Sequence, residues 1–166
     1  VETQAEVDAL PKNIDALTAG KDIGILVEGS GLVLDDFSIM GKTGYDDYCI
    51  AVDGQTDVTV SNCELTGGHV ALYYYASSGT ISHNTVHDYM KNGITANLPS
   101  GDGGYVEIRE NTVTGGGDID YIAQNGIQIG YGATGVVMDN TVSGHWYTGA
   151  DWASSGILIF ESDDCM

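Results

Sequence analysis

The sequence has few of the residues that mark several common classes of protein. Its 166 residues include only five lysines and arginines, two prolines and three cysteines. Because 24 acidic residues face the five basic ones, the formal net charge is −19. Such a surface repels the phosphates of nucleic acids and of anionic membranes. We therefore expect no nucleic-acid partner.

Long hydrophobic runs and zinc-like cysteine spacings are also missing. No apolar run approaches the roughly 20 residues that a membrane-spanning helix needs, so we expect no membrane insertion. Cys49, Cys63 and Cys165 do not have zinc-ligand spacing, and the sequence leaves their disulfide state open. No signal peptide is visible, but the chain begins with Val1 rather than Met, as a mature or trimmed product would. We expect an extracellular or cell-surface location.

The sequence does have a strand pattern that returns five times. It reads apolar-x-apolar-x-x-anchor-x-apolar, and subtraction of the anchor positions gives spacings of 26, 21, 27 and 29 residues. The anchors are Phe37, Cys63, Asn84, Asn111 and Asn140. A repeat of this length indicates one supersecondary unit that stacks on copies of itself.

A second pattern of paired apolar residues alternates with the first. Alternation of this kind turns one face of a strand inward, and equivalent strands of successive repeats run in the same direction and pair in parallel. The pairs are Ile25/Val27, Ile50/Val52, Val70/Leu72, Ile94/Ala96, Ile127/Ile129 and Ile157/Ile159. We therefore predict an all-β fold, a parallel β-helix of about six coils with two short strands in each.

The last three anchors are all asparagines. In stacked coils Asn84, Asn111 and Asn140 would lie in register, and each side-chain amide would bond to the next coil. The preceding column reads Asp36, Asn62, His83, Glu110 and Asp139. Its carboxylates would be bridged by a cation, or the side chains would point apart into water. Arg109, which lies beside these acids, is expected to form an ion pair.

At this point the chain resembles the right-handed parallel β-helix proteins of the pectate-lyase-like superfold, nearest to secreted bacterial β-helix proteins of unassigned activity. The stretches that carry the resemblance lie between about residues 24 and 160 and include "VTVSNCELTGG", "GTISHNTVHDY", "YVEIRENTVTGGG" and "SGILIFES". The resemblance implies the fold strongly and the activity weakly, because this fold carries lyases, hydrolases, epimerases, adhesins and stalks. The signatures of the polygalacturonases and pectate lyases of the superfold are absent.

Two segments are expected along the chain. Residues 1–20 form a cap: Thr3 and Glu6 match a capping box, and Pro11 divides the segment into two short helical turns. Four apolar residues at helical spacing would cover the first coil, namely Val7, Leu10, Ile14 and Leu17. Residues 21–166 form the β-helix, which we expect to be truncated or uncapped at its C-terminal end.

The loops that follow the anchor strand concentrate aromatic and charged residues. Stacking would bring these loops to one edge, where rings could stack on sugars and carboxylates could bind hydroxyl groups. The candidate ligand-binding residues are Tyr45, Tyr48, His87, Tyr89, Tyr121, His145, Trp146, Tyr147 and Trp152, and the same loops carry His69 and Lys91. The alternative is that these rings simply pin the loops onto the rod.

Acidic residues in the same loops are weaker candidates for a metal site or for catalysis. Asp46, Asp47, Asp118, Asp120 and Asp151 could hold Ca²⁺ through oxygen ligands. Catalysis could use Asp88, Lys91, Asp118 and Asp120, as paired carboxylates for glycoside hydrolysis or as a lysine base for a lyase.

The leading hypothesis is a non-catalytic extracellular module. It would be a structural rod whose loop edge binds a polysaccharide, a cell-surface glycan or cations, and copies of the rod could assemble end to end. The alternative is a polysaccharide-active enzyme, either a lyase or a glycoside hydrolase, that uses the same edge.

Overall fold

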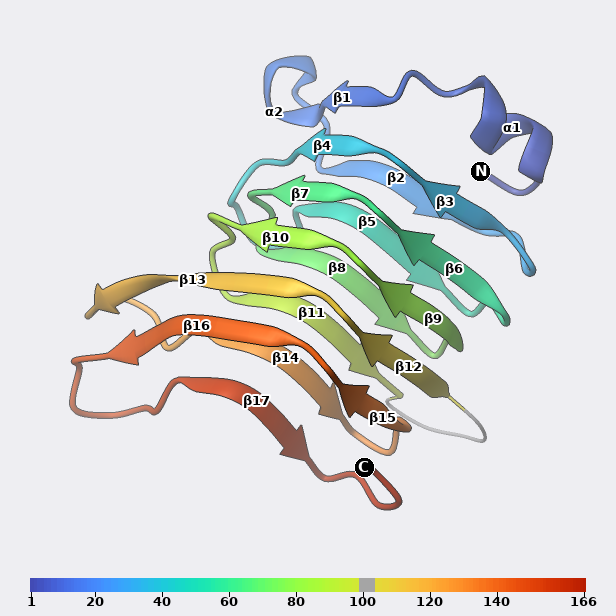
Figure 1. Ribbon diagram of the computed structural model, residues 1–166. Helices are drawn as coiled ribbons and strands as arrows, with labels where there is room; N and C mark the ends of the chain where they lie inside the picture. Colours follow the sequence, from blue (N-terminus) through green and yellow to red (C-terminus); the bar gives the residue numbers. More distant parts are fainter. Residues whose placement is uncertain (99–103) are drawn as a thin grey trace.

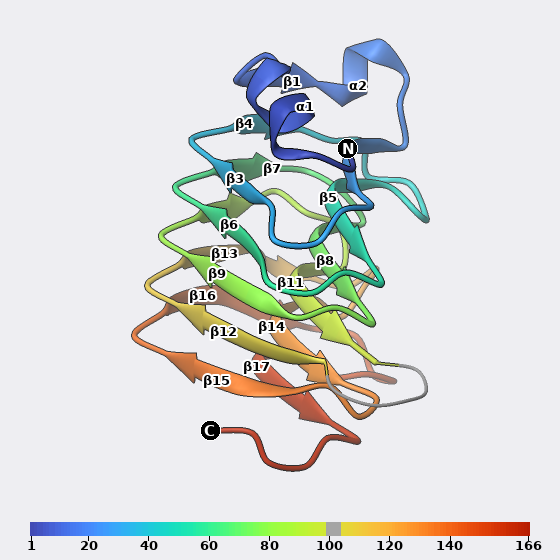
Figure 2. The ribbon, with the colours of Figure 1, turned by 90° about the vertical axis from the view of Figure 1, so that its right-hand side faces the viewer.

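Three parallel sheets wrap around a single core in the computed structural model, which describes residues 1–98 and 104–166 (Figure 1). Each sheet is made by equivalent strands of successive coils, and the view in Figure 2 shows the coils stacked from the N-terminal cap downward. The chain is therefore the parallel β-helix of about six coils that the repeats predict.

The strands are divided among three sheets, and every pair of neighbouring strands is parallel. Sheet A contains β1 (Asn13–Asp15), β4 (Ser38–Met40), β7 (Glu64–Thr66), β10 (Thr85–His87), β13 (Thr112–Ile119) and β16 (Thr141–Tyr147). Sheet B contains β2 (Ile23–Val27), β5 (Tyr48–Asp53), β8 (Val70–Tyr75), β11 (Asn92–Asn97), β14 (Asn125–Gly130) and β17 (Ser155–Phe160). Sheet C contains β3 (Val33–Asp35), β6 (Val58–Ser61), β9 (Gly79–Ser82), β12 (Tyr105–Arg109) and β15 (Thr134–Met138).

A coil has three strands, so the prediction of two was wrong. The anchor pattern folds as a sheet C strand, a two-residue corner and a sheet A strand. The first corner residue always has a positive φ, between 53° and 61°, at Asp36, Asn62, His83, Glu110 and Asp139. This left-handed residue bends the chain. The bend inserts one extra outward residue between the apolar positions of the two strands, which is the x-x step of the repeat.

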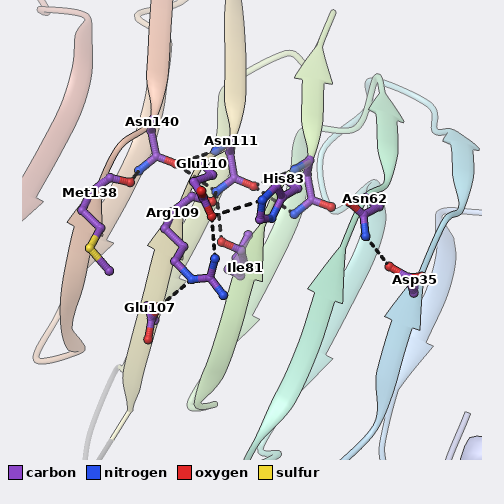
Figure 3. A network of polar contacts seen from close by, with 11 residues as sticks. Asp35, Asn62, Ile81, His83, Glu107, Arg109, Glu110, Asn111, Met138 and Asn140 are labelled. Atoms are coloured by element: carbon purple, nitrogen blue, oxygen red, sulfur yellow. Dashed lines mark hydrogen bonds and ion pairs between the residues drawn. The ribbon is translucent and has the colours of Figure 1, made fainter.

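The second corner residue builds the predicted asparagine ladder (Figure 3). Asn84 donates its side-chain amide to Oδ1 of Asn111 at 3.0 Å, and Asn111 donates to Oδ1 of Asn140 at 2.9 Å. The Oδ1 atom of each of the three asparagines also accepts the backbone N–H of the anchor in the preceding coil, at 2.9 Å from Cys63 N to Asn84 Oδ1, for example. The ladder therefore satisfies backbone donors that the corners would otherwise leave buried and unpaired.

Three of the left-handed corner residues, Asn62, His83 and Glu110, make side-chain contacts with other protein groups. Arg109 contacts the carboxylates of Glu107 at 2.6 Å and Glu110 at 2.5 Å, and His83 lies 3.1 Å from Glu110 (Figure 3). The predicted ion pair of Arg109 is thus confirmed. Asn62 donates to Asp35 at 2.7 Å in the same row of corners.

The predicted register was wrong in one coil. Leu72 pairs with Ile50 and with Ile94, so Leu72 and Tyr74, not Val70 and Leu72, form the inward pair. Tyr74 is completely buried, and its hydroxyl donates to the carbonyl of Val58 at 3.0 Å. Tyr73 therefore projects from the outer face of sheet B. The buried hydroxyl finds its partner in the backbone, which is why a tyrosine is tolerated in the core.

The N-terminal segment forms two short helices, α1 (Gln4–Ala9) and α2 (Ala16–Ala19), as predicted. The capping box is present, since Thr3 Oγ1 accepts from Glu6 N and the Glu6 carboxylate accepts from Thr3 N. Between the helices, β1 adds an unpredicted first strand to sheet A. Val7 is buried, but Leu17 is half-exposed and does not belong to the apolar face that its spacing predicted.

The three cysteines are free, and Cys49 and Cys63 are buried. Burial raises the pKa of the Cys49 thiol to about 12 and that of Cys63 to about 11, so both are unreactive core residues. Within the described ranges, neither helix has the length and apolar character needed to cross a membrane.

Candidate functional site

The candidate site is a cleft at the edge where sheet A turns into sheet B. After the first turn at this edge, which contains α2, five successive turns follow, residues 41–47, 67–69, 88–91, 120–124 and 148–154. The cleft has a volume of about 440 Å³ and is lined by Tyr45, His69, Lys91, Tyr121, Ile122, Ala123, Tyr147 and Trp152. Each of the five coils therefore contributes to one continuous surface, as the stacking of the loops predicts.

Aromatic rings give the cleft its apolar walls. The side chains of Tyr45, Tyr121 and Trp152 are 81%, 71% and 75% exposed, so their faces are open to a ligand. Tyr45 stacks on His69 with ring centroids 4.5 Å apart, which fixes one wall. Exposed rings that are held by neighbouring groups suit ligands with an apolar face and polar edges.

Lys91 and His69 supply the polar groups of the cleft. Lys91 Nζ donates to the carbonyl of Ala123, and its own backbone N–H donates to the carbonyl of His69 at 2.8 Å. Burial lowers the pKa of Lys91. Burial, and secondarily the positive charge of Lys91, lower the pKa of His69. The imidazole is therefore favoured in its neutral form.

Two predicted binding residues, the buried Tyr89 and the half-buried His145, form a pair outside the lining of the cleft. Tyr89 is 3% exposed, and its hydroxyl is hydrogen-bonded to Nε2 of His145. Glycines make room for both rings: a Cβ at Gly93 would lie 3.0 Å from Tyr89, and one at Gly126 would lie 2.9 Å from His145. Burial raises the pKa of Tyr89 and lowers that of His145. Tyr89 therefore braces the loops from inside and presents no face to a ligand.

Other predicted residues lie on the outer faces of the sheets. His87 sits on sheet A between Glu64 at 3.6 Å and Asp88 at 2.8 Å. Tyr48 lies on sheet B and stacks on Tyr73 with ring centroids 5.4 Å apart. Trp146 is exposed on β16 and does not line the cleft.

The rings of Tyr48 and Tyr73 border a smaller hollow on sheet B, of about 160 Å³, together with Tyr75. The contribution of Tyr73 was missed because the predicted inward pair, Val70 and Leu72, made Ala71 the outward residue between them. Repeated tyrosines in "LYYYA" were the available signal.

The acidic candidates do not form a metal site among the residues that the structure describes. No group of three or more potential ligands comes together in that part of the chain. Asp47 is buried and accepts the N–H of Gly44 at 2.5 Å, so it stabilises its own turn, with Lys42 4.0 Å away. Asp46, Asp118, Asp120 and Asp151 are exposed to solvent. None of these five carboxylates lines the cleft.

A hollow of about 500 Å³ beside the cap is larger but lacks aromatic walls. It is lined by Val1, Glu2, Glu6, Ala9, Leu10 and Glu28. Its three carboxylates and short apolar side chains offer no stacking surface. The loop-edge cleft is therefore the site with the richer recognition chemistry.

Comparison with known proteins agrees with the architecture. A family model described as "Right handed beta helix region" matches residues 48–165. No curated protein and no solved structure shows significant similarity to the chain. With a match over more than half of its length and three parallel sheets coiled around one core, the chain belongs to the right-handed β-helix family.

Proposed function

We propose that this chain is an extracellular, non-catalytic β-helical module that binds a glycan in the loop-edge cleft. The observation that carries the proposal is the lining of the cleft, where exposed rings surround Lys91 and His69. Sugar rings have apolar faces that stack on aromatic side chains and hydroxyl groups that bond to polar ones. The coiled scaffold holds these groups in place, which lowers the entropy lost on binding.

A matched pair of tryptophans tests the proposal. Trp152 lines the cleft, whereas Trp146 is similarly exposed but lies outside it. We expect Trp152→Ala to weaken glycan binding by about tenfold or more, as the loss of an aromatic anchor typically does. Trp146→Ala should retain binding.

A glycan array followed by calorimetry on the best ligand measures both effects. The absence of any glycan ligand for the wild-type protein would overturn the proposal. Equal losses in the two variants would move the binding surface away from the cleft.

End-to-end association is a second candidate, favoured by the last described coil. The side chains of Ile157, Ile159 and Phe160 on β17 are 49%, 43% and 41% exposed, although the first two occupy the inward column. A second copy that covers this face would bury apolar surface. Light scattering of the 166-residue chain tests this candidate: Ile159→Lys should dissociate any assembly, and a wild-type monomer at all concentrations would exclude it.

The polysaccharide-active enzyme is supported more weakly. Asp88, Asp118 and Asp120 lie outside the cleft lining, so no described pair of carboxylates flanks a bound sugar there. Turnover of a polysaccharide that is abolished by Lys91→Met would favour a lyase over a binding module.

A further inference from the structure

Lys91 differs from the other basic side chains in its burial and its partners. Lys12 and Lys21 make no described ion pair, and Lys12 Nζ donates to the carbonyl of Asp35, but both side chains are exposed to solvent. Lys42 contacts Asp22 at 2.5 Å, and Arg109 contacts two glutamates, so their charges are neutralised by carboxylates. Within the described residues, Lys91 makes no ion pair, and its Nζ is bonded to a backbone carbonyl. Among the five basic side chains, Lys91 therefore combines half-burial, a place in the lining of the cleft and no carboxylate partner among the described residues.

The same surroundings make the ammonium form of Lys91 less favourable than it is in water. The side chain is half-buried, and burial lowers its pKa, because removing water penalises the charged form. The neighbour of Lys91 in the preceding coil is His69, whose imidazole, unlike a carboxylate, does not stabilise an ammonium ion. A lysine amine in a partly dry pocket is a better nucleophile than one in water.

We propose that Lys91 is a covalent attachment site for aldehydes, which its amine captures as an imine inside the loop-edge cleft. In this step the lone pair of Nζ adds to the carbonyl carbon. The resulting carbinolamine loses the carbonyl oxygen as water, with the two hydrogens that the nitrogen gives up, and a C=N bond replaces the C=O bond. No oxidant, reductant or metal is consumed.

The cleft indicates which aldehydes it takes. Its volume of about 440 Å³ and its exposed rings suit a sugar, and the open-chain form of a reducing sugar carries an aldehyde. The rings of Tyr45, Tyr121 and Trp152 would hold the sugar while its reducing end reacts. This choice of aldehyde rests on the proposed glycan function, whereas the nucleophilicity of Lys91 does not.

Reductive trapping tests the proposal on the whole protein. The chain is incubated at neutral pH with glyceraldehyde and cyanoborohydride, which reduces the imine to a stable amine, and peptide mass spectrometry follows each lysine over time. We expect Lys91 to be labelled severalfold faster than Lys21, which is exposed to solvent. Labelling of Lys21 at an equal or higher rate would overturn the proposal.

Two substitutions control the experiment. Lys91→Arg should abolish the fast product, because a guanidinium is not a comparable nucleophile, while Lys21→Arg should leave that product unchanged. If the Lys91→Arg variant still gives a rapidly labelled product, the label lies on another group, and the proposal is wrong. Circular dichroism of both variants shows whether the fold is retained.

A methyl glycoside, which has no free aldehyde, separates this inference from the proposed function. If the glycoside binds but glyceraldehyde does not label Lys91 preferentially, the proposed glycan binding is retained and the proposed aldehyde capture is rejected. If Lys91 is trapped by glyceraldehyde but no glycan binds, the capture site stands and the glycan function falls.

Discussion

The two edges of sheet A are built in opposite ways. Where the chain enters the sheet from sheet C, every corner has two residues, a left-handed residue followed by an inward anchor. Where the chain leaves the sheet toward sheet B after β4, successive turns have seven, three, four, five and seven residues, by subtraction of the strand bounds. The constant edge carries the asparagine ladder, and the variable edge carries the cleft. Regular spacing permits bonds between identical residues, and irregular spacing permits a hollow.

Breaking the constant edge should have the largest effect on stability. Asn111 is buried, its Oδ1 accepts from Asn84, and its Nδ2 donates to the carbonyl of Ile81 at 3.0 Å. We expect Asn111→Ala to lower the free energy of unfolding by about 3 kcal/mol, because several buried groups lose their partners. Urea denaturation measures the change. Asn140→Ala, at the less buried end of the ladder, should cost less, and an equal cost would show that the ladder is not cooperative.

The pair of Tyr89 and His145 at the variable edge should matter less for stability than the ladder. Tyr89→Phe removes one hydroxyl and leaves Nε2 of His145 without a partner. We expect a loss of about 1–2 kcal/mol in the free energy of unfolding, since one buried group becomes unsatisfied. Thermal denaturation tests this value. No change in stability would mean that water replaces the hydroxyl and that the pair does not brace the loops.

The variable edge should also be the source of acid sensitivity between about pH 5 and 7. Burial lowers the pKa values of His69 and His145 below the value of about 6.5 expected in the unfolded chain. The unfolded state therefore binds more protons in this window, so the free energy of unfolding is largest above pH 7 and falls as the pH drops through 6.5. Urea denaturation at a series of pH values across this range gives the free energy of unfolding at each pH. That free energy should change less steeply with pH in the double variant His69→Gln/His145→Gln than in the wild-type protein. An unchanged slope would assign the sensitivity to other groups.

The smallest effect is expected on the solvent side of the constant edge. Arg109→Ala removes the contacts to Glu107 and Glu110, which are partly exposed. Surface ion pairs of this kind contribute about 0.5 kcal/mol, and salt screens them. Denaturation at low and high salt should show a small loss that disappears in salt. If Arg109→Ala lowered the free energy of unfolding as much as Asn111→Ala does, the ion pairs, and not the side-chain amides, would be the main source of stability at this edge.

The sequence predicted the constant edge better than the variable one. Asn84, Asn111 and Asn140 recur in register, so their ladder follows from their spacing. The bend just before them was missed, although the two-residue gap between apolar positions, as at Asp35 and the left-handed Asp36, marks it in the sequence. Tyr74 was missed as a core residue because its hydroxyl needs a backbone acceptor, Val58, that lies 16 residues away in the chain.

The cleft was predicted in outline only. Tyr45, Tyr121 and Trp152 face it, as their place in the loops suggested. Whether a loop ring points outward or inward depends on space that other coils provide, and glycines in those coils create that space for Tyr89 and His145. Such long-range complementarity is not encoded in the spacing of the loops themselves.

The ladder also has a mechanical consequence. Bonds between coils run along the axis of the rod, so a pulling force on the axis would load the coil interfaces in series, and the weakest would yield first. The side-chain amides cross the interfaces from Cys63 to Asn140, but neither Phe37 nor Cys63 has a side-chain amide to offer at the interface between them. There the carboxylate of Asp35 provides the side-chain bridge, to Ser61 and Asn62. Under tension, the chain should part at this interface before the asparagine-linked coils separate.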